Sequence, residues 1–226
     1  MAAATDQTPI INSPSAYFER TVATAIHNFP TARLLRRADA GQVEMRHYHA
    51  ILCCLFHQTY SGPYTFARAA VNCEWRHELA KEYLLRHAEE ERIHWRWILD
   101  DLKSTGYSGP DLRNAPPHYT TQAYLGLNYY IAEHTPIARL ATAAVLEGIG
   151  AAYGGVYARK IVQQLKLQKC QISFFSSHAE TDVVHTAELN NVLAASELTT
   201  EDWTWMSHAA EIAGRFYRAI YDHEAF

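Results

Sequence analysis

The chain lacks the sequence signals of an exported or membrane-spanning protein. Its first residues, MAAATDQTPIINSPS, contain neither the cationic start nor the apolar core of a signal peptide. No apolar run reaches the roughly 18 residues that a membrane-crossing helix needs. These absences argue against an integral helical membrane protein, and we expect a cytoplasmic protein that does not act at a membrane.

The chain also has few cysteines and a small net charge. The four cysteines, at positions 53, 54, 73 and 170, form no Cys-x-x-Cys pair and no disulfide framework, which favours a reducing compartment. The 20 basic and 24 acidic residues give a net charge of -4, so no basic field is available for nucleic acid. We expect a small-molecule substrate and no nucleic-acid partner. Whether the chain forms a homodimer stays open.

Strand signals are missing, and helical patterns take their place. With 48% apolar and 12% aromatic residues, the chain can bury a substantial core. We expect an all-α protein, with a flexible arm over 1–13 and a single helical domain over 14–226. The expected helices begin at Pro14 after an N-cap at Ser13, and run over 42–72, 75–105, 120–133, 136–167, about 171–195 and about 200–223. A kink or break is expected at 61–63, and the Pro- and Gly-rich segment 107–121 is the clearest connector.

Three residues of the stretch FFSSHAETDVVHTAELNN, at 174–191, are spaced for one helix face. His178, Asp182 and His185 are separated by four and seven positions, which places them within about 60° of arc on an α-helix. Two imidazoles and a carboxylate form a set that Fe, Mn or Zn accepts, and with open positions it is typical of ferrous iron. The alternative is a solvent-facing stripe with incidental histidines.

A second stretch, RHAEEERIHWRWILDDL at 86–102, repeats this spacing. His87, Glu91 and His94 are again four and seven positions apart, and Glu91 with His94 forms the Glu-x-x-His unit of di-iron helices. Two unrelated stripes would rarely share this pattern. Glu90 and His87 lie near the same face, so the identity of the ligands besides His94 stays open here.

Glu147 is the only acidic residue of the segment LATAAVLEGIGAAYGGVYARK, at 140–160. A carboxylate in so apolar a wall is costly unless a metal ion or a buried Arg neutralises it, and the alternative is an exposed edge position. Glycines at 148, 150, 154 and 155 weaken the same helix. They indicate either close helix packing or a local bulge that leaves room beside a metal.

Taken together, these motifs resemble those of the heme-oxygenase-like diiron oxidases and oxygenases. That superfamily shares a seven-helix bundle with heme oxygenase, thiaminase II and pyrroloquinoline-quinone synthase, and the resemblance spans about 14–225. It implies six protein ligands. They are Glu91, His94, Glu147, His178, Asp182 and His185. In some members the carboxylate ligand lies seven positions before the histidine of this helix, where this chain has His87. If His87 ligates, Glu91 instead supports the site from outside the ligand set.

The resemblance further implies two Fe(II) ions, with O2 as co-substrate, acting on a small amino-acid-like or aliphatic carboxylate substrate in natural-product biosynthesis. C–H activation, desaturation, C–C cleavage and N-oxygenation are the expected outcomes. Arg139 and Arg159 are candidate anchors for a substrate carboxylate. The rival classes are a metal-free thiaminase-II-like hydrolase with a cysteine nucleophile, a ferritin-like iron-binding bundle, and a metal-free scaffold.

Overall fold

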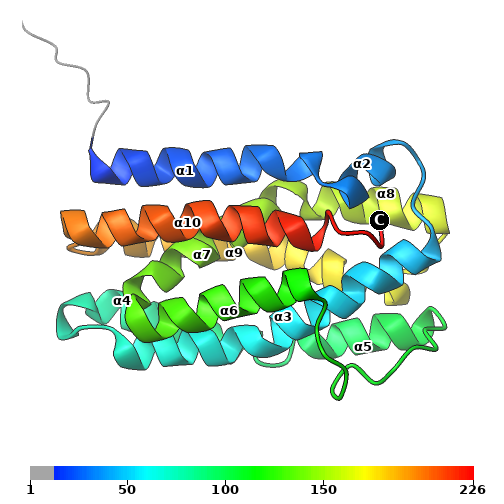
Figure 1. The fold of residues 1–226 in the computed structure, drawn as a ribbon, viewed down its shortest axis with the longest axis horizontal. Helices are drawn as coiled ribbons and strands as arrows, with labels where there is room; N and C mark the ends of the chain where they lie inside the picture. Colours follow the sequence, from blue (N-terminus) through cyan, green and yellow to red (C-terminus); the bar gives the residue numbers. More distant parts are fainter. Residues whose placement is uncertain (1–12) are drawn as a thin grey trace, which may run out of the picture.

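The molecule is built from helices that run along one long axis (Figure 1). The computed structural model describes residues 13–226, so the expected arm lies outside the described residues except for Ser13. The helices are α1 Pro14–Asn28, α2 Arg33–Asp39, α3 Met45–Asn72, α4 Glu78–Glu91, α5 Trp95–Ser104, α6 Tyr119–His134, α7 Arg139–Ile149, α8 Gly155–Leu165, α9 Ser173–Ala195 and α10 Thr200–Ile220. Residues 13–226 contain no strand, and the expected all-α class is confirmed.

Side-chain caps fix the beginning of the first and last helices, and the cap at Ser13 is the one expected from the sequence. The Ser13 hydroxyl accepts a hydrogen bond from the Ala16 amide at 3.2 Å, and Pro14 occupies the first helical position, where its missing N–H costs nothing. Thr199 caps α10, because its hydroxyl accepts from the Asp202 amide at 3.2 Å while the Asp202 carboxylate accepts from the Thr199 amide at 2.8 Å. The caps fix where α1 and α10 begin, and these two helices pack against each other.

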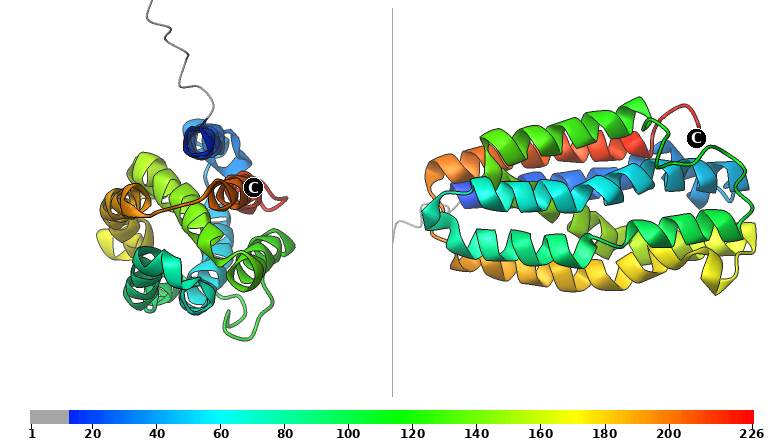
Figure 2. Two further views of the ribbon diagram at one scale, coloured as in Figure 1. Left: turned by 90° about the vertical axis from the view of Figure 1, so that its left-hand side faces the viewer. Right: turned by 90° about the horizontal axis from the view of Figure 1, so that it is seen from below.

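Helix α7 lies in the middle of the bundle. Most of its side chains are buried, and it packs against α1, α6, α9 and α10. The end-on view in Figure 2 shows the other helices arranged around it. Helix α3 packs against α4, α5 and α6, and α9 packs against α4, α5, α7 and α8. The side chain of Glu147 on α7 therefore lies in the interior of the molecule.

The expected break at Pro63 does not occur. Helix α3 continues through this residue as one helix to Asn72. Proline removes one helical hydrogen bond, but α3 is held on its flanks by α4 and α6, and the Thr65 hydroxyl donates to the Gly62 carbonyl at 2.8 Å. Tertiary packing thus overrides the local signal.

The expected single helix over 75–105 is wrong, because it divides into α4 and α5. The amide of His94 donates to the Glu91 carbonyl at 3.2 Å, and the amide of Trp97 donates to the His94 carbonyl at 3.1 Å. These three-residue spacings are those of a tight 3₁₀-like turn. The turn rotates α5 relative to α4, so Glu91 and His94 do not lie on one continuous helix.

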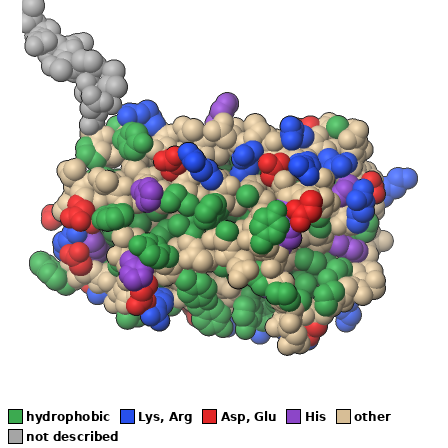
Figure 3. Space-filling model, in the orientation of Figure 1, with side chains coloured by type: hydrophobic (Ala, Val, Ile, Leu, Met, Phe, Trp, Pro, Cys, Tyr) green, Lys and Arg blue, Asp and Glu red, His purple; other side chains and the backbone are tan. Residues whose placement is uncertain are grey.

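Within residues 13–226, no helix is long and apolar enough to cross a membrane. On the face shown in Figure 3, acidic and basic side chains are interspersed rather than gathered by sign. This agrees with the small net charge of the chain.

Candidate metal centre

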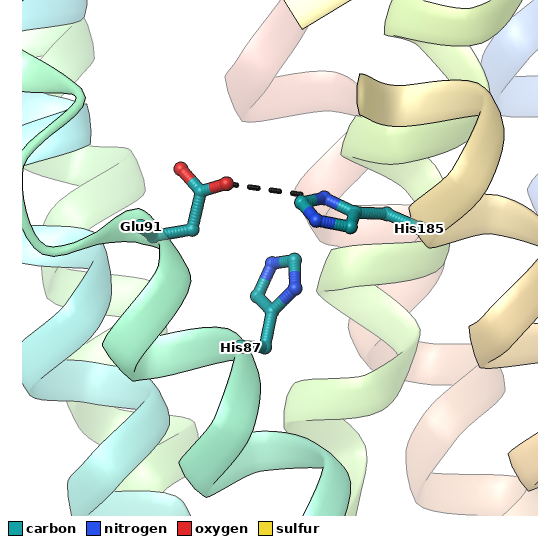
Figure 4. Close-up of side chains that lie close together, drawn as sticks. All are labelled: His87, Glu91 and His185. Carbon is teal, nitrogen blue, oxygen red and sulfur yellow. Dashed lines mark ion pairs between the residues drawn. The ribbon is translucent and has the colours of Figure 1, made fainter. Parts of the chain in front are cut away.

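Side chains from three helices meet at the centre of the bundle. His87 and Glu91 come from α4, Glu147 from α7, and His185 from α9. Figure 4 shows Glu91 and His185 pointing toward one another across the space between their helices, with His87 entering from below. The Glu91 Oε1 atom lies 3.8 Å from His185 Nδ1. The four-residue spacing of His87 and Glu91 on α4 directs both side chains into this space.

The structure brings all six predicted ligands together, along with His87. Their nitrogen and oxygen atoms form three groups, each with its ligand atoms within 4.8 Å of one another. The groups are His87 with Glu91 and His185, Glu91 with His94 and His178, and Glu147 with Asp182 and His185. Glu91 belongs to the first two groups and His185 to the first and third. We refer to these seven residues as the central cluster.

Two carboxylates of the central cluster each contact two histidines. Glu91 Oε2 lies 2.9 Å from His94 Nδ1 and 3.6 Å from His178 Nε2. At the other end, Glu147 Oε1 lies 3.2 Å from His87 Nε2, and Glu147 Oε2 lies 3.3 Å from His185 Nδ1. Glu90, which the sequence left as an alternative ligand, lies 3.3 Å from the Nε2 atom of His185 and 3.8 Å from Arg86. It is far more exposed than Glu91.

Neighbouring histidines stabilise the ionised form of two carboxylates of the central cluster but not of the third. Burial penalises the ionised form of Glu91, but hydrogen bonds with His178 and His94 outweigh it and hold the Glu91 pKa well below its usual value. Histidines likewise lower the pKa of buried Glu147, to about 2. Asp182 has no such partner, and burial together with the charges of Glu147 and Glu91 raises its pKa well above the usual value. Three carboxylates therefore share one buried space that lacks enough positive charge.

A divalent cation fits this imbalance. The Nδ1 atom of His87 is buried and makes no hydrogen bond within the described residues. An unpaired buried nitrogen and an excess of carboxylate are costly in a protein interior, and metal coordination satisfies both. The mixture of imidazole and carboxylate suits iron or manganese better than a soft thiolate-seeking metal.

A bulge in the central helix makes room for Asp182. Residues Gly150–Gly154 form a π-helical segment between α7 and α8. A Cβ atom on Gly150 would lie 1.6 Å from Asp182 Oδ2, and one on Gly154 would touch Ala179 at about 3.5 Å. Close packing of α9 against the glycines is therefore confirmed, and the π-helical segment makes room for the Asp182 carboxylate. Room beside a metal ion stays a prediction.

Helix α9 is held in place from outside its own sequence. Its N-cap residue, Ile172, makes no capping hydrogen bond, but the fully buried Asp101 of α5 does so instead. The Asp101 carboxylate accepts from the Ser173 amide at 2.8 Å, from the Ser173 hydroxyl at 2.6 Å and from the Phe174 amide at 3.0 Å. Sequence reasoning missed Asp101, because a cap supplied by a distant segment leaves no local pattern.

Replacing Asp101 with asparagine should therefore loosen α9. The new amide turns an NH2 group toward backbone N–H groups that need an acceptor, which should cost about 1–3 kcal/mol of unfolding free energy. Urea denaturation measures this loss, and the affinity for iron should fall with it. The adjacent Asp100→Asn is the matched control, because Asp100 is exposed. Equal stability of the two variants would contradict the capping role.

A cavity of about 100 Å³ opens beside the central cluster. Its lining includes His87, Glu91, Glu147, His178 and Asp182, while the rest of the wall is mostly apolar and aromatic. Trp97 stacks on His94 with ring centroids 4.2 Å apart and supports that ring from behind. None of the four cysteines lines this cavity, and neither do the connector residues 107–118.

The predicted carboxylate anchors lie elsewhere. Arg139 is buried, donates to Thr65 at 3.2 Å and to Thr142 at 2.5 Å, and stacks over the Phe66 ring at 3.6 Å. Arg159 is exposed to solvent. Neither side chain lines the cavity beside the cluster.

The helical topology is that of a heme-oxygenase-like bundle, and its interior gathers histidine and carboxylate side chains that could hold a metal ion. The chain belongs to the family of iron-containing redox enzymes, whose model matches residues 55–218. The family and fold expected from the sequence are thereby confirmed. No curated protein sequence matches the chain significantly.

Solved structures show the same fold at low sequence identity. A Shewanella denitrificans domain of unknown function with a heme oxygenase-like fold is 22% identical, with a TM-score of 0.81 over 94% of this chain and 91% of that one. A TenA homologue from Pseudomonas syringae is 12% identical, with a TM-score of 0.71 over 96% and 97%. Heme oxygenase-1 from Synechocystis, solved with heme, is 11% identical, with a TM-score of 0.69 over 93% and 91%.

Proposed function

We propose that this protein is an O2-dependent non-heme diiron oxidase or oxygenase acting on a small organic substrate. The observation that carries the proposal is the position of Glu91, which belongs to two of the ligand groups at once. A carboxylate shared in this way can hold two metal ions side by side, as in di-iron helical bundles. Two ferrous ions bound there would supply the electrons for dioxygen activation.

The residues of the cluster divide into two ends. His94 and His178 would hold one ion together with Glu91, while His87, Glu147, Asp182 and His185 surround the other position. Asp182 would ligate in its ionised form, and because its pKa is raised in the metal-free protein, metal binding there competes with the proton. The apolar wall beside the cluster excludes water, which protects a reactive centre from side reactions.

The rival functions fit the cluster less well. A heme group would leave three buried carboxylates beside a porphyrin without neutralising them, whereas bare metal ions neutralise them directly. A thiaminase-II-like hydrolase needs a cysteine nucleophile, and no cysteine lines the cavity. A ferritin-like site uses two Glu-x-x-His units, of which this chain has one convincing copy.

Anaerobic titration with ferrous salt tests the proposal. The purified protein should bind close to two irons per chain, and exposure to oxygen in the presence of a substrate should lead to oxygen consumption. Stoichiometric zinc binding without any oxygen reactivity would point to a hydrolase instead.

The change His178→Ala should reduce oxygen consumption by more than about 100-fold, since even loss of an outer hydrogen-bonding partner of a metal ligand costs about 10–100-fold. Helical content, measured by circular dichroism, should stay unchanged. His208→Ala on the exposed face of α10 is the matched control and should behave as the parent protein. Full activity of the His178 variant would remove this residue from the ligand set.

A further inference from the structure

A groove of about 390 Å³ lies on the outer surface of the bundle, where α3, α4 and the start of α5 meet. Large apolar side chains line it and remain open to solvent, with exposed fractions of 43% for Tyr60, 59% for Tyr64 and 51% for Leu85. The Trp95 ring packs edge to face against Tyr60, with ring centroids 5.7 Å apart. A gathering of exposed apolar side chains of this kind marks an interaction surface.

This surface continues from α3 onto α6. The rings of Tyr60 and Tyr64 have centroids 5.9 Å apart, and the Tyr129 phenol of α6 is near enough to help raise the pKa of the Tyr64 hydroxyl. Tyr129 is itself 44% exposed. We call Tyr60, Tyr64, Leu85, Trp95 and Tyr129 the aromatic face.

The charged side chains around the aromatic face are paired within the chain. Among the described residues that line the groove, only Glu89 and Arg92 are charged, and they lie 2.7 Å apart. Toward α6, one turn beyond Tyr64, Arg68 pairs with Glu133 at 2.5 Å. The face therefore presents no field of one sign to attract nucleic acid, an anionic membrane or a strongly charged protein.

A second copy of the chain has the surface that complements this face. Tyrosine and tryptophan are enriched at the centre of protein interfaces, and charged groups are depleted there. When two such faces meet about a two-fold axis, each brings an acid and a base to the edge of the contact, so like charges need not oppose one another. The second copy is also always present at the same concentration.

The aromatic face covers the outer side of the turn between α4 and α5. Glu91 and His94 reach the central cluster from this turn, while the residues that follow them, Arg92 and Trp95, line the groove. The Trp95 indole N–H donates to the Arg92 carbonyl at 3.1 Å and so joins the two groove residues across the turn. A molecule seated on the face would contact both.

We propose that two copies of this chain pair through the aromatic face, and that pairing holds the turn carrying Glu91 and His94 in place for metal binding. The second half of this inference rests on the proposed function, whereas the first half does not. Pairing buries Tyr64 near Arg92 and Trp95 of the same copy and restricts the motion of the turn that carries the two ligands.

Sedimentation velocity on the metal-free full-length chain tests the pairing. The dimer fraction should rise with protein concentration. Raising the salt from about 0.1 M to 1 M shortens the Debye length from about 10 Å to about 3 Å and should not dissociate the dimer, since its contacts are mainly apolar. A protein that stays monomeric at every concentration would overturn the inference and would leave the face to a different partner.

Tyr64→Glu tests whether the dimer uses the aromatic face. It should weaken dimerisation by about 100-fold or more, because each copy then brings a carboxylate into the contact. Tyr17→Glu on α1 is the matched control, because Tyr17 is 55% exposed, close to the 59% of Tyr64, and lies outside the face. Circular dichroism checks the fold of both variants. Equal dimerisation of the two would overturn the assignment of the interface.

The link to the metal site can be measured without any substitution. Ferrous ion affinity, determined under nitrogen against a competing chelator, should be about fivefold or more higher above the dimerisation range than below it. By linkage, iron should tighten the dimer by the same factor. Equal affinities in monomer and dimer would overturn the effect on the turn. A dimer that binds no iron would refute the diiron function while the pairing stands.

Discussion

Replacing Glu91 with glutamine should abolish the paired binding of iron while leaving the bundle folded. The glutamine keeps the shape of the side chain but loses the charge that links the two ligand groups. Anaerobic titration should find at most one iron per chain, and oxygen consumption should fall by more than about 100-fold. This exceeds the loss of about 10–100-fold that follows when a residue hydrogen-bonded to a metal ligand is removed. Two tightly bound irons in this variant would contradict the bridging position of Glu91.

The metal-free stability of this variant gives a second, independent readout. The pKa of Glu91 is lowered in the folded protein, so its ionised form stabilises the fold above the unfolded pKa of 4.5. Glu91→Gln should therefore lower the unfolding free energy at neutral pH by about 1–3 kcal/mol. The loss should shrink as the pH falls below 4.5, where the parent protein also begins to lose this contribution.

Asp182→Asn should change the unfolding free energy of the metal-free protein in the opposite direction. The pKa of Asp182 is raised in the fold, so its contribution to stability is fully present only below the unfolded pKa of 3.8 and is lost as the pH rises through the folded value. The neutral amide should therefore stabilise the metal-free protein at neutral pH by about 1 kcal/mol, while still weakening iron binding. Urea denaturation of metal-free samples across pH compares the two variants. Shifts of the same sign would contradict the charge balance described for the cluster.

The part of the site that the sequence could predict is the part that depends on one regular helix. His178, Asp182 and His185 lie on the unbroken helix α9, where spacing alone determines which side chains share a face. The Glu147 prediction rested on the cost of a carboxylate among apolar residues, and the structure does bury it within the cluster. The role of these residues as metal ligands stays a prediction.

What the sequence could not predict depends on contacts between segments. The turn between Glu91 and His94 breaks a stretch that contains no Gly or Pro, so neither a helix-breaking residue nor the periodicity gives a sign of it. Pro63 carries a strong local signal for a break, yet neighbouring helices hold α3 together around it. The choice among His87, Glu90 and Glu91 also needed coordinates, because all three lie near the same face of α4 and only their distances to α7 and α9 distinguish them.

Replacing Gly150 with alanine should damage the metal site through a single methyl group. The new Cβ atom would lie 1.6 Å from Oδ2, 2.6 Å from Cγ and 3.1 Å from Cβ of Asp182. Because all three distances are short, rotation of the carboxylate alone cannot relieve the overlap, and Asp182 must leave its place between Glu147 and His185. We expect iron binding to weaken by about 10–100-fold or more, because loss of a residue that only hydrogen-bonds to a metal ligand already has an effect of this size.

The same substitution should leave the helical structure intact, since alanine favours helix over glycine by up to about 1 kcal/mol. Gly126→Ala on α6 is the matched control, because a Cβ atom at Gly126 would meet no atom within 4 Å. That variant should gain stability and keep its iron. The comparison isolates the close approach of the π-helical segment to α9, because both variants add the same methyl group to a helix. If Gly150→Ala bound iron as tightly as Gly126→Ala, Asp182 would not be needed at the position where the bulge admits it, and the metal site would have to be assembled from the remaining residues.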